Sequence, residues 1–263
     1  MTFIRFIGRL AISFFAFIGQ LCDLVWEVVV SLFRGRFYWS QLMKQIVEIG
    51  FRSQLVVILT GAFTGAVLSA QAIFQMEQFK METMAGAVVS VGMLRELGPT
   101  VTALMLAGRV GASMAAEIGT MKVTEQVDAL RSMDVHPIDY LVTPRFLAMA
   151  ISMPLLIAES VGFGILSSIQ IGTGVFGINE SYFNFHIAGR TEMVDIIISM
   201  IKGVTFGMLI VVISCHQGMR AKNGAVGVGR GTTNAMVYSS LAVLIVNYFL
   251  TMILNMLFPL GMV

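Results

Sequence analysis

The sequence predicts an all-α integral membrane protein with an N-terminal interfacial amphipathic helix, five transmembrane helices, and a cytoplasmic helix between the second and third spans. Hydrophobic residues make up 57% of the 263-residue chain and charged residues only 12%, whereas soluble domains carry about 25% charged residues. The mean hydropathy is +0.85. Five apolar stretches are each close to the ~20 residues that cross the hydrocarbon of a bilayer.

Residues 1–40 form the first predicted region, which precedes a permease domain over 41–263. Apolar residues recur there at helical spacing, but Arg5, Arg9, Asp23 and Glu27 interrupt them. Such a pattern favours an amphipathic helix lying in the membrane interface. A first transmembrane helix over Leu10–Val30 is the alternative, and the sequence leaves it open.

The five spans are predicted at about 53–74, 85–118, 146–176, 195–215 and 234–258. Small residues recur four apart on several of them, as at Gly61 and Gly65, a spacing that lets helix backbones approach closely. The second span is irregular, because it contains Arg95, Glu96, Pro99 and Arg109.

The distribution of basic residues predicts the orientation, since cytoplasmic loops carry an excess of Lys and Arg. Basic residues gather before the first span, in the loop between the second and third spans, and in the loop between the fourth and fifth spans: Arg5, Arg9, Arg34, Arg36, Lys44 and Arg52; Lys122, Arg131 and Arg145; Arg220, Lys222 and Arg230. The loops on the other side of the membrane hold only Lys80 and Arg190. We therefore expect a cytoplasmic N-terminus, an external C-terminus and a cytoplasmic loop over 119–145.

Charged residues inside such a chain are costly and mark candidate functional sites. Arg95 and Glu96 precede Pro99, which removes a backbone hydrogen bond and tends to kink a helix. The pair either opens a polar cavity for a headgroup or ion, or lies at the outer interface with the span beginning after Pro99. Glu159 is a lone carboxylate in the third span, able to pair with Arg95 or Arg109 or to line the cavity. We take Arg95, Glu96, Pro99 and Glu159 as candidate substrate-binding residues.

Arg109 and Glu117 lie eight residues apart, about two helical turns, and therefore share a face of one helix. We interpret them as structural intramembrane charges.

The segment Thr120–Asp134 alternates apolar and charged residues and ends before Pro137, which predicts a short helix on the cytoplasmic membrane surface. It is either a solvated connection or a docking helix that projects Glu125, Asp128 and Arg131. Its length and position resemble the cytoplasmic loop with which ABC-transporter membrane subunits engage their ATPase.

No motif in the chain points to catalysis. The glycine-rich run from Gly224 to Thr233 lacks the lysine of a phosphate-binding loop, and we expect a tight cytoplasmic turn there. His136, His186 and His216 are isolated, so no metal site, cofactor or enzyme activity is expected. The basic residues are scattered, which argues against nucleic-acid binding.

The segment from Arg95 to Arg145, in which charged residues interrupt the apolar sequence, is similar to the MlaE/YrbE permease family. The resemblance is carried by Arg-Glu-Leu-Gly-Pro at 95–99, Ala-Gly-Arg-Val-Gly-Ala at 107–112, the run 116–130, and Pro137, Tyr140–Val142 and Pro144–Arg145. It extends over roughly residues 40–260. It implies a multi-pass permease subunit of an ABC transporter in the bacterial inner membrane, moving phospholipids between inner and outer membranes and maintaining outer-membrane lipid asymmetry.

The resemblance also implies partners and roles. The partners are a second copy of the chain, cytoplasmic ABC ATPase subunits, a periplasmic hexameric ring of MCE-domain proteins, and a STAS-domain protein. The ring would face the runs from Asn179–Glu180 to Asp195. Arg95 and Glu96 match the polar pair near a lipid-binding cavity. The ATPase-coupling residues are Thr120, Met121, Lys122, Thr124, Glu125, Gln126, Asp128 and Arg131. A stand-alone ion-coupled transporter or channel using Arg95, Glu96 and Glu159 is the alternative function.

Overall fold

The computed structural model describes residues 2–33 and 38–258, and within them every regular element is helical. The all-α fold class is therefore confirmed. Arg34 and Arg36, which contribute to the predicted orientation, lie outside the described residues, as do the side chains of Arg5 and Arg9. The described residues contain six helical runs that are long and apolar enough to cross a membrane: Phe15–Phe33, Trp39–Glu77, Glu82–Val123, Ile138–Val175, Met193–Met219 and Gly224–Leu257. The last five correspond to the predicted spans.

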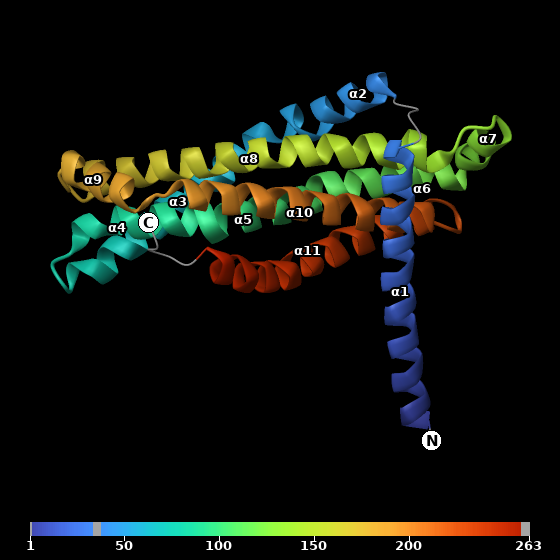
Figure 1. Cartoon of the computed structure of the whole chain (residues 1–263), viewed down its shortest axis with the longest axis horizontal. Coiled ribbons are helices and arrows are strands. Elements are labelled where there is room, and N and C mark those ends of the chain that lie inside the picture. Colours follow the sequence, from blue (N-terminus) through green and yellow to red (C-terminus); the bar gives the residue numbers. More distant parts are fainter. Residues whose placement is uncertain (1, 34–37, 259–263) are drawn as a thin grey trace.

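Helix α1 (Thr2–Phe33) runs across one end of the bundle formed by the other long helices (Figure 1). Its second half contacts α8 and α10, and the Thr143 hydroxyl donates to Ser31 Oγ over 2.9 Å. A direction transverse to the bundle is the one expected of an interfacial helix. The segment Phe15–Phe33 also has the length and apolarity of a span, so the interfacial assignment stays a prediction.

The bundle is built from α3 (Gln54–Glu77), α8 (Thr143–Gln170), α10 (Met193–Met219), α11 (Gly224–Leu257) and the run α4–α6. The short helix α2 (Trp39–Ile49) and the turn η1 (Phe51–Ser53) lead into α3. Close approach of α3 and α8 depends on glycine: a Cβ on Gly65 would collide with the backbone of Gly164.

The second predicted span is one long helical run with two π-helical segments. It consists of η2 (Glu82–Met84), α4 (Ala85–Gly92), η3 (Met93–Leu97), α5 (Gly98–Leu106), η4 (Ala107–Gly111) and α6 (Ala112–Val123). Pro99 occupies the first turn of α5, directly after the π-helical segment η3, and the helical run continues through it. Arg95 and Glu96 therefore lie inside the helical run, which does not begin after Pro99.

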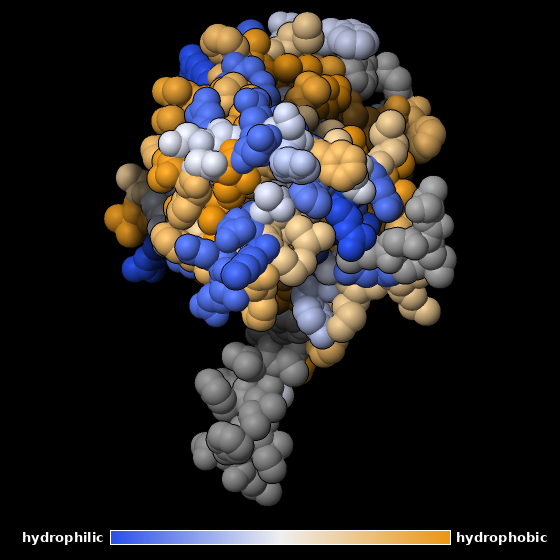
Figure 2. Space-filling model, turned by 90° about the vertical axis from the view of Figure 1, so that its left-hand side faces the viewer, coloured by the Kyte–Doolittle hydropathy of each residue, from blue (hydrophilic) through white to orange (hydrophobic). Residues whose placement is uncertain are grey.

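The two ends of the bundle carry different connections. Helix α7 (Gln126–Ser132) lies at the end crossed by α1, together with η5 (Ile138–Val142). Helix α9 (Glu180–Arg190), preceded by η6 (Ile171–Val175), lies at the opposite end beside α4. Figure 2 shows hydrophilic and hydrophobic side chains mixed over the α9 end.

Two local expectations differ from the structure. The glycine-rich run is not a tight turn, since α11 begins at Gly224; the reversal is made by Asn223 and Gly224, both with φ above 60°. The predicted helix over Thr120–Asp134 is divided: its first residues end α6, and Glu125 adopts a left-handed conformation, φ 61°, before α7.

Candidate functional site: a charged network between three membrane helices

Arg95 belongs to the second predicted span, and its side chain is buried against α10. Its Nε donates to Asp195 Oδ1 over 2.5 Å, and its Nη1 donates to Asn255 Oδ1 over 3.0 Å. Arg95 and Asp195 are 5% and 1% exposed. Asp195 also accepts from the backbone N–H of Glu192 in the capping box that begins α10. Two opposite charges buried together with further hydrogen bonds offset each other's desolvation.

Lys202 lies seven residues beyond Asp195 on α10, on the same face, and is fully buried. Its Nζ donates to the backbone carbonyl of Arg95 over 2.6 Å and to Thr251 Oγ1 over 2.8 Å. The same atom is 2.8 Å from Glu96 Oε1. An ammonium group has three donors, so all three donors of Lys202 are used within the network.

Glu96 is the charged member of the network that reaches the surface, with its side chain 39% exposed. Thr251 Oγ1 donates to its Oε1 over 3.0 Å, and Asn247 Nδ2 donates to its Oε2 over 3.1 Å. Glu96 also lines a cavity of about 370 Å³ together with Tyr248 and Asn255 of α11. The network therefore presents a carboxylate, and neither Lys202 nor Arg95 lines that cavity.

Each helix contributes to the network through a local feature of its sequence. Arg95 and Glu96 lie in the π-helical segment η3, and single π-turns inside α-helices are frequent at functional sites. On α11, residues Asn247, Thr251 and Asn255 are four apart and so form a polar stripe on one face.

An apolar groove of about 440 Å³ lies beside the same π-helical segment. It is formed by Leu97 together with residues of α3: Phe63, Thr64, Val67, Leu68 and Gln71. Since Glu96 and Leu97 are consecutive, two largely apolar cavities flank one segment of helix, and one of them contains the Glu96 carboxylate. This arrangement can hold an amphiphile, with the headgroup near Glu96 and the hydrocarbon near Leu97.

The other predicted site residues lie away from this network. Gln54 Nε2 donates to Glu159 Oε1 over 3.1 Å, and Arg109 Nη1 donates to Ser53 Oγ over 2.6 Å. Among the ion pairs found for residues 38–258, Glu159 pairs with neither Arg95 nor Arg109. Pro99 is buried one turn beyond Glu96.

Glu117 belongs to a separate contact near the α7 end. Its Oε2 lies 2.7 Å from Arg145 Nη2, and Arg145 Nη1 also donates to the carbonyl of Leu141 over 2.5 Å. Glu117 and Arg109 line one small cavity and so share a face as expected, but the ionic partner of Glu117 is Arg145. This pair joins α6 to the start of α8.

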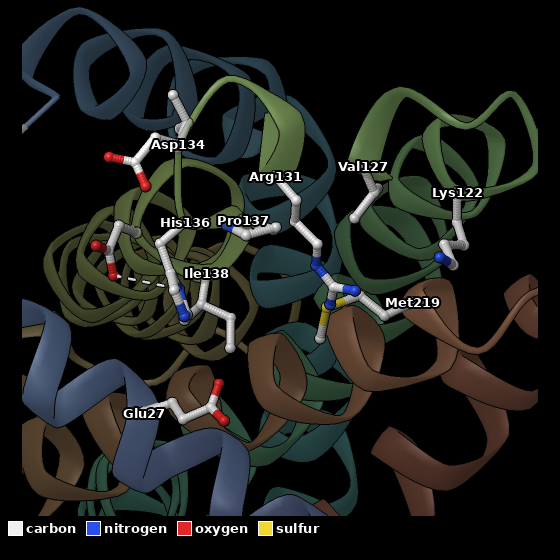
Figure 3. Close-up of a pocket in the computed structure, with 11 residues that line it drawn as sticks. Glu27, Lys122, Val127, Arg131, Asp134, His136, Pro137, Ile138 and Met219 are labelled. Carbon is white, nitrogen blue, oxygen red and sulfur yellow. Dashed lines mark ion pairs between the residues drawn. The ribbon is translucent and has the colours of Figure 1, made fainter. Parts of the chain in front are cut away.

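A second cavity, of about 760 Å³, opens at the α7 end between α7, the loop to η5, α1 and the end of α10. Figure 3 shows Arg131 reaching across it toward Met219, with Glu27 of α1 on the opposite wall. Lys122 Nζ lies 2.9 Å from Asp128 Oδ2. The hydrogen bond from Lys122, helped by the charges of Lys122 and Arg131, lowers the pKa of Asp128 below its ordinary value of 3.8.

Several members of the network were not predicted from the sequence. Asp195 was placed at the start of a span, and Lys202 was not singled out. The signal was present: Lys202 is a lone cation in an apolar span, seven residues from a carboxylate. Over residues 38–258 and the described side chains of α1, no group of three or more His, Cys, Asp or Glu could hold a metal ion.

Comparisons with known proteins cover nearly the whole chain. The family described as Permease MlaE matches residues 42–253. A probable ABC transporter permease protein of Rickettsia typhi is 40% identical over 248 residues, covering 94% of this chain and 96% of the relative. The intermembrane phospholipid transport system permease protein MlaE of Haemophilus influenzae is 34% identical over 255 residues, covering 97% and 98%. The chloroplastic protein TRIGALACTOSYLDIACYLGLYCEROL 1 of Arabidopsis thaliana is 35% identical over 225 residues, covering 86% and 64%.

Proposed function

Since the chain belongs to the MlaE permease family, we propose that it is the membrane subunit of an ABC transporter that moves phospholipids between inner and outer membranes and so maintains outer-membrane lipid asymmetry. The observation that carries this proposal is the Glu96 carboxylate, which lines one largely apolar cavity next to the apolar groove at Leu97. A phospholipid needs both surfaces within the length of one molecule. The name of the Haemophilus influenzae relative, a phospholipid transport permease, supports the same substrate class.

Of the residues expected to bind substrate, Glu96 keeps that role in the proposal, and Arg95 supports it. Glu96 meets the headgroup, and Arg95 holds the network in place from below through Asp195 and Asn255. Pro99 starts the helix that follows η3 and so fixes the position of the π-helical segment. Glu159 is assigned a place in the wall near Gln54, one helix away from the headgroup.

The energy source is proposed to be a separate cytoplasmic ABC ATPase that docks at the α7 end. Asp128 is tied to Lys122 and Arg131 by ion pairs, whereas Glu125 is exposed at the turn before α7. Six of the eight coupling residues named above thus divide into two groups. Lys122, Asp128 and Arg131 hold the connection together, and Thr124, Glu125 and Gln126 are available for contact.

The remaining partners follow from family membership. A second copy of the chain is proposed to cover the exposed apolar face of α11 and so to enclose the open side of the cavity that Leu244, Tyr248 and Met252 line together with Glu96. A periplasmic ring of MCE-domain proteins would meet the α9 end, and a STAS-domain protein would join on the ATPase side. The chain would then lie in the bacterial inner membrane with a cytoplasmic N-terminus and a periplasmic C-terminus.

Filling the groove tests the substrate assignment. Leu68→Trp places a large side chain in the groove beside Leu97, and we expect it to reduce both co-purified phospholipid and ATP-driven lipid transfer by the reconstituted complex. Leu55→Trp is the matched control, since Leu55 is an exposed residue of α3 outside the groove. Unchanged lipid binding and transfer in Leu68→Trp would refute the site.

Charge reversal tests the coupling assignment. We expect Glu125→Lys to reduce lipid-stimulated ATPase activity of the complex without lowering its melting temperature. Asp128→Lys should lower both, because it also breaks the ion pair with Lys122; adding Lys122→Asp should restore the melting temperature. Full ATPase activity in Glu125→Lys and in the double variant would contradict docking at α7.

The stand-alone ion-coupled transporter is less well supported. Arg95, Glu96, Asp195 and Lys202 neutralise one another within the network, and Glu159 lies with Gln54 outside it. A proton or ion path would need the carboxylates of Glu96, Asp195 and Glu159 to lie one after another along a route across the membrane. Ion-driven flux by the chain alone in liposomes would favour this alternative over the proposed lipid permease.

A further inference from the structure

The cations of the network are buried away from its cavity, whereas one of its carboxylates lines the cavity. Both cations are buried, with Arg95 5% and Lys202 0% exposed. All three donors of Lys202 are engaged, by Glu96, Thr251 and the carbonyl of Arg95. The phosphate of a bound lipid would therefore find no accessible ammonium or guanidinium from the network in this cavity.

The charged group that does line the cavity is the Glu96 carboxylate, whose side chain is 39% exposed. A carboxylate offers about four acceptor positions, and Lys202, Thr251 and Asn247 occupy three of them. One acceptor direction is left for a ligand. Because Lys202 lies beneath Glu96, the pair forms a dipole with its negative end toward the cavity.

Polar groups nearby complete a headgroup site. Asn255 lines the same cavity, and its Oδ1 is occupied by Arg95, which directs its Nδ2 donors elsewhere. Tyr248 adds a hydroxyl to the same wall. These neutral donors can bind a phosphate, while Glu96 can bind a cation a few bonds away from it.

We propose that this cavity selects phospholipids whose headgroup carries an ammonium group, as in phosphatidylethanolamine, over anionic lipids such as phosphatidylglycerol, and that Glu96 is the residue that reads this difference. The inference rests on the proposed function and narrows its substrate class. A partly exposed carboxylate paired with an ammonium contributes up to about 1 kcal/mol, which corresponds to about fivefold in affinity. A hydroxyl headgroup can donate to Glu96 but brings a net negative lipid next to a carboxylate.

Native mass spectrometry of the complex provides the test. The detergent-solubilised complex is equilibrated with equimolar phosphatidylethanolamine and phosphatidylglycerol that carry identical acyl chains, and the ratio of bound lipids is measured. We expect about a fivefold preference for phosphatidylethanolamine in the wild type. Glu96→Gln should reverse the preference toward phosphatidylglycerol, because Lys202 is then left without its carboxylate.

Further variants keep the test decisive if Glu96→Gln folds poorly. Glu96→Asp should retain the preference, and Glu96→Gln combined with Lys202→Met should abolish it, since both the carboxylate and the ammonium beneath it are then removed. Glu77→Gln, an exposed carboxylate at the end of α3, is the control and should behave as wild type. Equal binding of both lipids, or preference for phosphatidylglycerol in the wild type, would refute this inference alone. Absence of any bound phospholipid would refute the proposed function itself.

Discussion

Lys202 Nζ lies 2.8 Å from Glu96 Oε1, although the two residues belong to different helices of the bundle. The same ammonium reaches the backbone carbonyl of Arg95, so it binds both the side chain and the main chain of the π-helical segment η3. A lone lysine in a membrane span is costly. The position of Lys202 is explained by these contacts, because they hold in place the segment η3, which carries the partly exposed carboxylate of Glu96.

Removal of this lysine should destabilise the bundle. We expect Lys202→Met to lower the free energy of unfolding by about 3 kcal/mol, the lower part of the range for one partner of a buried ion pair, because Glu96 is partly exposed. SDS-titration unfolding measures the change. Lys44→Met, at an exposed position on α2, should have little effect.

A double-mutant cycle separates the ion pair from the packing of the lysine stem. Adding Glu96→Gln to Lys202→Met should recover part of the lost stability, since no unpaired carboxylate is left. If the double variant is as unstable as the sum of the two single variants, the pair makes no coupled contribution.

Sequence reasoning found two of the four charged members of this network, and the reason is physical. Arg95 and Glu96 were recognisable because adjacent charges inside an apolar stretch are rare. Their partners could not be assigned, since Asp195, Lys202 and Asn255 come from helices whose rotation about their own axes is set by packing. Glu159 was the only carboxylate considered for pairing with Arg95, yet α8 turns it toward Gln54.

Packing of α3 against α8 should be sensitive to one methyl group. Gly65→Ala would place Cβ against the backbone of Gly164, which cannot move as a flexible side chain would. We expect destabilisation of about 1–3 kcal/mol, the usual cost of overpacking, and a matching fall in the melting temperature in detergent. Gly162→Ala on α8 is the control, because no atom lies within 4 Å of its added Cβ. Equal melting temperatures for both variants would contradict the close approach.

The helices were largely predictable, whereas the deviations inside them were not. Long apolar stretches define the spans because the hydrocarbon thickness sets their length. The π-helical segments η3 and η4 leave no signal in apolar periodicity, since each changes the helix by a single residue. Pro99 suggested a kink, but a proline in the first turn of a helix is tolerated. The glycines after Gly224 suggested a turn, but close packing against the preceding loop accounts for at least Gly227.

The connection between α6 and α7 should loosen at low pH. The pKa of Asp128 is lowered, first by its hydrogen bond from Lys122, so its folded-state pKa lies below the unfolded value. Its contribution to stability is therefore complete above the ordinary value of 3.8 and is lost as the pH falls through the lowered pKa. A spin label in α7 should show increasing mobility over that range in wild type. Asp128→Asn should show high mobility at every pH, and an unchanged titration in that variant would assign the effect to another group.

The transverse position of α1 should depend on a small set of contacts at its middle. The Phe17 ring stacks edge-on against His216 at 5.3 Å and against Tyr238 at 5.7 Å. One turn on, Gln20 Oε1 accepts from Arg220 Nη1 over 2.7 Å.

Combining Phe17→Ala with Gln20→Ala removes these contacts and keeps the bond between Ser31 and Thr143 at the far end of the helix. We expect the first half of α1 to swing while the bundle stays intact. Spin labels at Ile12 and Val226, both exposed, would report this movement as a broadened distribution of the distance between them. The exposed Cys22 is replaced by alanine in this experiment. Ile18→Ala, also on α1 and exposed, should leave the distribution narrow. A narrow distribution in the double variant as well would mean that the membrane surface, and not α10 and α11, holds this helix across the bundle.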